Sequence, residues 1–141
     1  MAKPKTAGHI LAPAVPVDQR KIRFSFEYLQ ADHLKFQLAD CDRSYFESLF
    51  REILRYQTYT LDQFKAPSPA DRRHFIHFPN TTEPEWFPGI DPADDENLWT
   101  EDCWQFGLPG QAGGSTWRVH GFISEEVFHV VWFDPFHRLD P

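Results

Sequence analysis

The chain has 141 residues, a formal net charge of −7 and an aromatic content of 16%. This length is typical of one domain that can bury roughly 70% of the surface its unfolded chain exposes. The negative charge disfavours a generic nucleic-acid binder. No apolar run reaches the ~20 residues that span a bilayer. We also expect no signal peptide, because the N-terminus lacks an apolar core. With only two cysteines the chain is not a disulfide scaffold, so we expect a cytoplasmic protein.

The negative charge is concentrated in one segment, an acidic loop over residues 79–102 that has no Lys or Arg. Its eight acids are Glu83, Glu85, Asp91, Asp94, Asp95, Glu96, Glu101 and Asp102. The remaining residues carry 13 acids against 14 Lys and Arg and are nearly neutral. Two interpretations stay open: the loop covers a basic groove and mimics nucleic-acid charge, or it is a solvated insertion.

The N-terminal part predicts a tail followed by strands. Residues 1–20 contain three prolines and no apolar period, which indicates a flexible tail before a single domain of residues 21–141. Residues 22–29 alternate between apolar and polar, as a half-buried strand does. Residues 34–38 alternate again, so we expect them to form a hairpin with the first strand.

The next segment changes to a helical period between Asp40 and Tyr56. Asp40, Asp42 or Ser44 could cap this helix, and Glu47 and Arg51 are spaced to pair on its exposed side. The stripe expected to pack on the core is Tyr45, Phe46, Leu49, Phe50, Ile53 and Leu54. Thr60 and Gln63 have the spacing of a capping box, which predicts a short second helix ending before Pro67.

The rest of the chain is rich in strand formers. Residues 72–78, 103–108, 117–123 and 127–133 read as strands, the last two joined by the turn 124–126, and residues 109–115 as a glycine-rich connector. Asp134-Pro135 ends the closing hairpin. The order predicts an α+β fold, with a mainly antiparallel twisted sheet of about five to six strands packed on one long and one short helix.

Alternation along the closing hairpin predicts which side chains can meet. On its first strand Arg118, His120 and Phe122 share a face, opposite Trp117, Val119 and Ile123. On its second strand His129 shares a face with Val127, Val131 and Phe133, opposite Phe128, Val130 and Trp132. We expect Arg118 and His120 on the wetter face of the sheet.

These residues predict a candidate site for RNA cleavage, which needs a base, an acid and a cation for the phosphate. Arg118 would bind the phosphate through its planar fork, with His120 and His137 as base and acid. The residues expected to add binding or orientation are Arg72, Arg73, Asp134 and Arg138. The alternative is that all of them are polar residues on a sheet surface. His74 and His77 lie three apart on a strand and face opposite ways, so we expect no metal site and no cofactor.

The hairpin also resembles that of the RelE/ParE superfamily of bacterial toxins. The matching features are Arg118 at the start of a strand, the polar turn 124–126, the apolar strand 127–133, and His137-Arg138 just after it. The resemblance implies a toxin of a toxin–antitoxin module, with endoribonuclease activity, an antitoxin partner, and RNA or the ribosome as target.

A second interpretation is a non-enzymatic interaction module, such as a defence- or mobile-element protein that docks a partner through Trp86, Phe87 and Trp99. One form of it resembles SocB, a toxin that occupies the protein groove of the replication sliding clamp. The peptides closest to the required motif are Gln30…Leu34-Lys35-Phe36 and Gln57…Leu61…Phe64.

Overall fold

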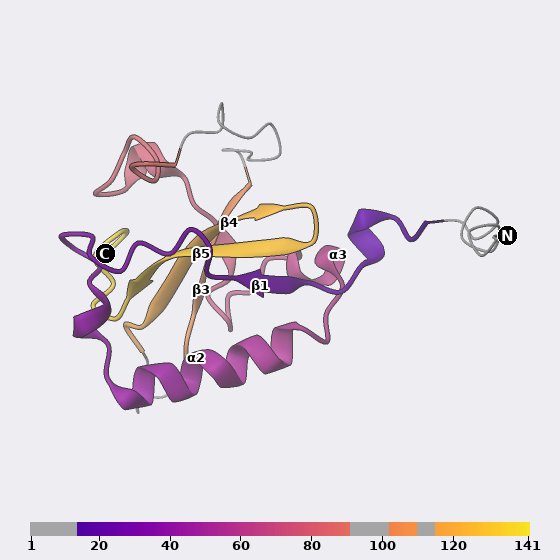
Figure 1. Ribbon diagram of the computed structural model, residues 1–141, viewed down its shortest axis with the longest axis horizontal. Helices are drawn as coiled ribbons and strands as arrows, with labels where there is room; N and C mark the ends of the chain where they lie inside the picture. Colours follow the sequence, from indigo (N-terminus) through magenta and orange to yellow (C-terminus); the bar gives the residue numbers. More distant parts are fainter. Residues whose placement is uncertain (1–13, 91–101, 110–114) are drawn as a thin grey trace, which may run out of the picture.

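The computed structural model describes residues 14–90, 102–109 and 115–141, and it confirms the α+β fold (Figure 1). Within these residues the sheet has five strands in the order β1-β5-β4-β3-β2. The elements are η1 (Val17–Gln19), β1 (Arg23–Ser25), η2 (Leu38–Asp40), α2 (Arg43–Tyr56), α3 (Leu61–Phe64), β2 (His74–Phe75), η3 (Phe78–Asn80), β3 (Cys103–Gly107), β4 (Arg118–Ser124) and β5 (Val127–Asp134). The predictions for residues 1–13, for 91–101 of the acidic loop and for 110–114 of the connector lie outside the described residues.

Strands β2, β3, β4 and β5 pair antiparallel, whereas β1 joins β5 in parallel. The predicted hairpin between residues 22–29 and 34–38 is therefore wrong. The second segment forms only an isolated bridge between Asp32 and Gln37. The reason is packing on opposite faces: Phe24 of β1 contacts Phe128, while Phe36 turns away and stacks on Trp132 with ring centroids 4.5 Å apart.

Helix α2 begins one residue after Asp42, whose carboxylate accepts a hydrogen bond from the backbone N–H of Tyr45 at 2.9 Å. The expected cap at Asp42 is thus present. Its predicted ion pair differs, because Glu47 pairs with Arg43 at 3.0 Å rather than with Arg51. The shorter helix α3 has both hydrogen bonds of the capping box predicted for Thr60 and Gln63.

The buried side of α2 is rotated from the predicted stripe. Its buried residues are Tyr45, Ser48, Leu49, Glu52 and Tyr56. Phe50 and Leu54, which we expected in the core, are 54% and 61% exposed. Contacts with other parts of the chain fix this orientation of the helix. The Tyr45 hydroxyl donates to the carbonyl of Arg118 at 2.7 Å, and the Arg55 guanidinium donates to the Asp71 carboxylate at 3.0 Å.

The sheet is covered on both faces, and each face has its own apolar core. Helices α2 and α3 pack on one face, where Leu49 and Phe64 meet Val119 and Phe128. Irregular segments cover the other face, where Phe36, Phe78 and Phe87 pack in the second core with Phe122 and Trp132. In Figure 1 the segment before β3 that includes η3 lies above the sheet, whereas α2 lies below it. The expectation of a wetter face for Arg118 and His120 is wrong for this reason: they are 5% and 0% exposed.

A β-bulge in β5 changes which side chains share a face. His120 pairs with Trp132 and Gly121 with Val130, so Val131 is an extra residue without a partner in the register. Strict alternation placed Trp132 with Val130, whereas the bulge moves Trp132 into the second core. Two residues further on, it brings Asp134 to the face that carries His120.

Gly121 is required where the bulge brings two backbones together. A Cβ on Gly121 would lie 2.1 Å from the carbonyl oxygen of His129 and 2.6 Å from the Phe128 ring. Both neighbours are in the paired strand β5, so neither can move without disturbing the register.

We predict that Gly121→Ala lowers the free energy of unfolding by about 3 kcal/mol or more, because the added methyl overpacks a backbone contact. Gly107→Ala is the matched control in the neighbouring strand. Its Cβ would meet Cβ and Cδ of Arg72 at 3.2 Å and the carbonyl oxygen of Asp71 at 3.3 Å. These contacts need a shift of only a few tenths of an ångström, so about 1 kcal/mol is expected. Urea unfolding measures both, and equal losses would contradict a special constraint at Gly121.

Candidate functional site

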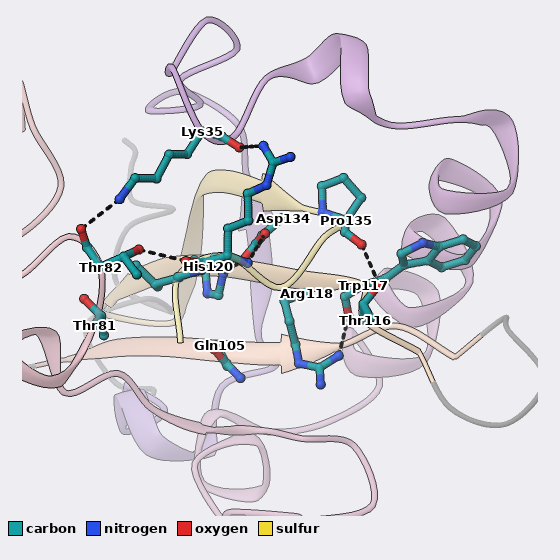
Figure 2. A network of polar contacts seen from close by, with 12 residues as sticks. Lys35, Thr81, Thr82, Gln105, Thr116, Trp117, Arg118, His120, Asp134 and Pro135 are labelled. Atoms are coloured by element: carbon teal, nitrogen blue, oxygen red, sulfur yellow. Dashed lines mark hydrogen bonds and ion pairs between the residues drawn. The ribbon is translucent and has the colours of Figure 1, made fainter. Parts of the chain in front are cut away.

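The centre of the candidate site is a hydrogen bond between His120 and Asp134 (Figure 2). The Nε2 atom of His120 lies 2.9 Å from Oδ2 of Asp134, and the two residues are 0% and 1% exposed. A carboxylate can only accept, so Nε2 carries the proton and donates. This leaves Nδ1 of His120 buried, with no hydrogen-bond partner among the described residues.

The same carboxylate fixes the turn that follows β5. Oδ1 of Asp134 accepts from the backbone N–H of Arg138 at 2.8 Å, and Oδ2 accepts from that of Leu139 at 3.1 Å. From the other side Thr82 donates its N–H to the carbonyl of Leu139 and its hydroxyl to that of Arg138. His137 lies inside this turn with a φ of 56°, so its backbone is held in a left-handed conformation.

The surroundings of Asp134 keep it ionised. Burial by itself would raise its pKa, but the hydrogen bond and charge of His120 and the two backbone donors lower it more. The net result is a pKa of Asp134 below its usual value. A buried charge of this kind stabilises the fold only while its partners are in place.

Arg118 is the second buried group of the site and is the phosphate ligand predicted from the sequence. Its guanidinium donates to the carbonyls of Ser115 at 2.8 Å and Trp117 at 3.0 Å. Its Nε is buried and has no partner among the described residues, and none of their carboxylates forms an ion pair with it. Burial and the neighbouring Arg72 lower the pKa of Arg118 from its usual value, which Asp134 offsets in part.

Arg72 and His137 lie beside this guanidinium. Gly107 pairs with Arg118 across β3 and β4, and the Arg72 side chain passes within 3.2 Å of the position of a Cβ on Gly107. The pKa of His137 is lowered by burial and then by the charge of Arg118. We call Arg72, Arg118 and His137 the cationic cluster.

Two other predicted binding residues lie elsewhere. Arg73 is 5% exposed and donates to the carbonyls of Phe64 at 2.7 Å and Ala66 at 2.9 Å, so its guanidinium faces the protein. Arg138 is exposed, and its guanidinium lies 4.7 Å from the centre of the Phe136 ring. The structure thus separates Arg72 from Arg73, although they are adjacent in sequence.

Of the three predicted catalytic residues, His137 and Arg118 lie near one another, whereas His120 is fully buried. Phe36 and Trp132 pack edge-on against the His120 ring. In this arrangement His120 orients Asp134 rather than meeting a solvent-borne substrate. Whether any of the three is catalytic stays a prediction.

Sequence reasoning missed Gln105 and Thr82. Gln105 is 3% exposed, pairs in register with His120, and its Nε2 lies 3.1 Å from Nε2 of His74. A polar residue between Trp104 and Phe106 in an otherwise apolar strand was the available signal. No such signal marks Thr82, because its contacts are to the distant C-terminal turn.

No known family model matches this chain, and neither a curated protein nor a solved structure is significantly similar to it. The RelE/ParE resemblance therefore stays a prediction. Among residues 14–90, 102–109 and 115–141, no three His, Cys, Asp or Glu side chains cluster as metal ligands would. Within the same residues, no helix has the length and apolar character that crossing a membrane requires.

The two peptides that resemble a sliding-clamp motif bury their aromatic residues. Phe36 is 1% exposed and Phe64 is 0% exposed. A peptide that inserts into a protein groove must present its aromatic anchor, so neither segment is free to dock in this conformation.

We predict that Asp134→Ala lowers the free energy of unfolding by about 3–5 kcal/mol, because it leaves His120 and two backbone N–H groups buried without an acceptor. The pKa of Asp134 is depressed in the folded state, so its contribution is fully present above about pH 4 and is lost as pH falls through the lower folded pKa. Urea unfolding at several pH values measures this. Asp18→Ala, at an exposed acid of η1, is the control, and a loss in Asp134→Ala that does not shrink in acid would contradict the assignment.

We also predict that His137 titrates below its usual value of about 6.5. Arg118→Gln should raise the pKa of His137, because it removes the nearest positive charge acting on this ring. NMR titration of the His137 ring protons in both proteins tests the placement directly. Arg23→Gln removes an exposed charge from β1 and should leave the titration unchanged.

Proposed function

We propose that this protein binds RNA through the cationic cluster and acts as a toxin-like protein on RNA or the translation machinery. The observation that carries the proposal is Arg118: the residue is 5% exposed, its Nε has no partner among the described residues, and none of their carboxylates forms an ion pair with it. Burying a cation without a counter-charge is costly, so such a site is suited to an anionic ligand. A phosphodiester is the anion whose geometry a guanidinium fork matches.

The charge around the cluster supports a phosphate rather than a small neutral ligand. Arg72 adds a second guanidinium. Neither it nor Arg118 forms an ion pair with an acid of the described residues, and Asp134 offsets the lowered pKa of Arg118 only in part. The acids nearest in sequence have other partners, since Asp71 pairs with Arg55 and Arg73, and Asp134 pairs with His120. The exposed Arg72 guanidinium therefore remains available to pair with a phosphate.

The chemistry that such a site can support is transesterification of RNA. In this reaction the 2′-hydroxyl attacks the adjacent phosphorus and the 5′-oxygen leaves, which gives a 2′,3′-cyclic phosphate and a 5′-hydroxyl. His137 takes the proton of the 2′-hydroxyl, because its lowered pKa leaves it neutral at pH 7. Arg118 and Arg72 neutralise the phosphate oxygens, and water supplies the proton to the leaving oxygen.

Within this proposal His120 and Asp134 are positioning residues. They hold the turn of His137 against β4, so that the imidazole stays next to Arg118. The proposed partners are RNA or the ribosome as target, and an antitoxin protein that would cover the cluster.

We expect the purified full chain to bind a labelled single-stranded RNA in fluorescence anisotropy, and induced expression to arrest bacterial growth. Arg118→Gln should weaken binding about tenfold and lower the salt dependence by about 0.7 in log–log slope for each lost phosphate contact. It should also relieve the growth arrest. Arg72→Gln is a second variant at an exposed position, where folding is not at risk.

Arg23→Gln removes the same charge from an exposed site on β1 and should bind RNA as the parent does. Cleavage is then followed by gel analysis across pH. Activity should fall as pH drops through the pKa of His137, which lies below its usual value of about 6.5. A parent protein that binds no RNA and does not affect growth would contradict the proposal. RNA binding that survives both Arg118→Gln and Arg72→Gln would place the site elsewhere.

A further inference from the structure

Helix α2 carries a ridge of large apolar side chains on the side that does not pack on the sheet. The ridge consists of Phe46, Phe50 and Leu54, spaced four residues apart. Phe50 is 54% and Leu54 61% exposed, while Phe46 is partly buried. Figure 1 shows α2 along the outside of the molecule, with the sheet on its other side. Contiguous exposed apolar side chains of this size on a regular helix are typical of an interaction surface.

A second row of charged residues runs beside the ridge and lines the same hollow: Arg43, Glu47 and Arg51. Arg43 and Glu47 pair at 3.0 Å within the helix, and both are well exposed. Arg51 is exposed and forms no ion pair with any described residue. The row therefore has the charge order plus, minus, plus, with one cation that lacks a partner.

We propose that the ridge is an interface on which a second copy of this chain docks, with the two α2 helices antiparallel about a two-fold axis. Side chains four residues apart form ridges that fit into the matching grooves of another helix, at a crossing angle of about −50°. A two-fold interface brings the same surface of both copies together, so a single self-complementary ridge is sufficient.

The charged row selects one register for this pairing. When the rings of one ridge lie between those of the other and the axis passes near Leu49, Glu47 of each copy faces Arg51 of the other. Moving the axis to Glu47 places the two Glu47 side chains against each other. Moving it to Arg51 opposes the two Arg51 side chains instead. Of these three registers, only the first places an acid opposite Arg51. The two-fold axis makes this Glu47–Arg51 contact occur once from each copy.

This register also brings two cations together, and one of them is already neutralised within its own copy. Arg43 of one copy then lies across from Arg55 of the other, and Arg55 is paired with Glu52 at 2.7 Å and with Asp71 at 3.0 Å. A helix of 14 residues is about 21 Å long, so the contact is small compared with standard interfaces. The dimer should therefore be weak and depend on concentration.

Sedimentation velocity of the full chain over a wide range of concentrations tests the proposal. We expect a monomer–dimer equilibrium, and Phe50→Glu should leave only monomer. Glu47→Arg alone and Arg51→Glu alone should each raise the dissociation constant about tenfold or more, because like charges then meet across the interface. The double variant Glu47→Arg/Arg51→Glu should restore dimerisation, since it exchanges the two charges.

Leu34→Glu is the matched control, because Leu34 is 85% exposed and lies outside α2. It should dimerise as the parent does, and thermal unfolding checks that every variant is folded. A parent chain that stays monomeric at all concentrations overturns the proposal and leaves the ridge to a different protein. A dimer that tolerates Phe50→Glu, or that the double charge exchange does not restore, overturns it as well.

Discussion

The hydrogen bond between His120 and Asp134 is the contact on which the candidate site depends. It connects β4 to the end of β5 at a point where neither side chain meets water. Buried polar groups of this kind are stable only when they are satisfied together. Since Asp134 also accepts from two backbone N–H groups of the C-terminal turn, one carboxylate sets the register of the last strand and the position of His137.

This contact exists because of the bulge at Val131. The extra residue reverses the alternation of β5, which turns Trp132 and Asp134 toward the face of His120. Irregular segments then cover that face, so the sheet has two cores rather than one. Arg118 lies at the start of β4 in register with Asp134 and Gly107, and its side chain is buried there with two backbone carbonyls as acceptors.

Local patterns in the sequence were sufficient for most elements. The capping box at Thr60, the cap at Asp42 and the β-rich closing hairpin are all present, because each depends on residues within a few positions of one another. The predicted hairpin of residues 34–38 failed because alternation alone does not distinguish a strand from an extended segment that buries one ring. The predicted buried stripe of α2 was rotated from the observed one. Helical spacing gives the period of the apolar residues but does not say which side of the helix meets the sheet.

The sequence by itself determined the fold class, the type of most elements and the residues from which the site is built. Only the tertiary structure decided which of these residues meet. A single bulge changes the face of the sheet on which the following side chains lie. A cover of loops decides whether a sheet face is dry. Neither feature leaves a periodic pattern in the sequence. His120, Asp134, Arg118 and His137 were therefore all identifiable as candidates. Their division into a buried positioning pair and a cationic cluster follows from long-range packing alone.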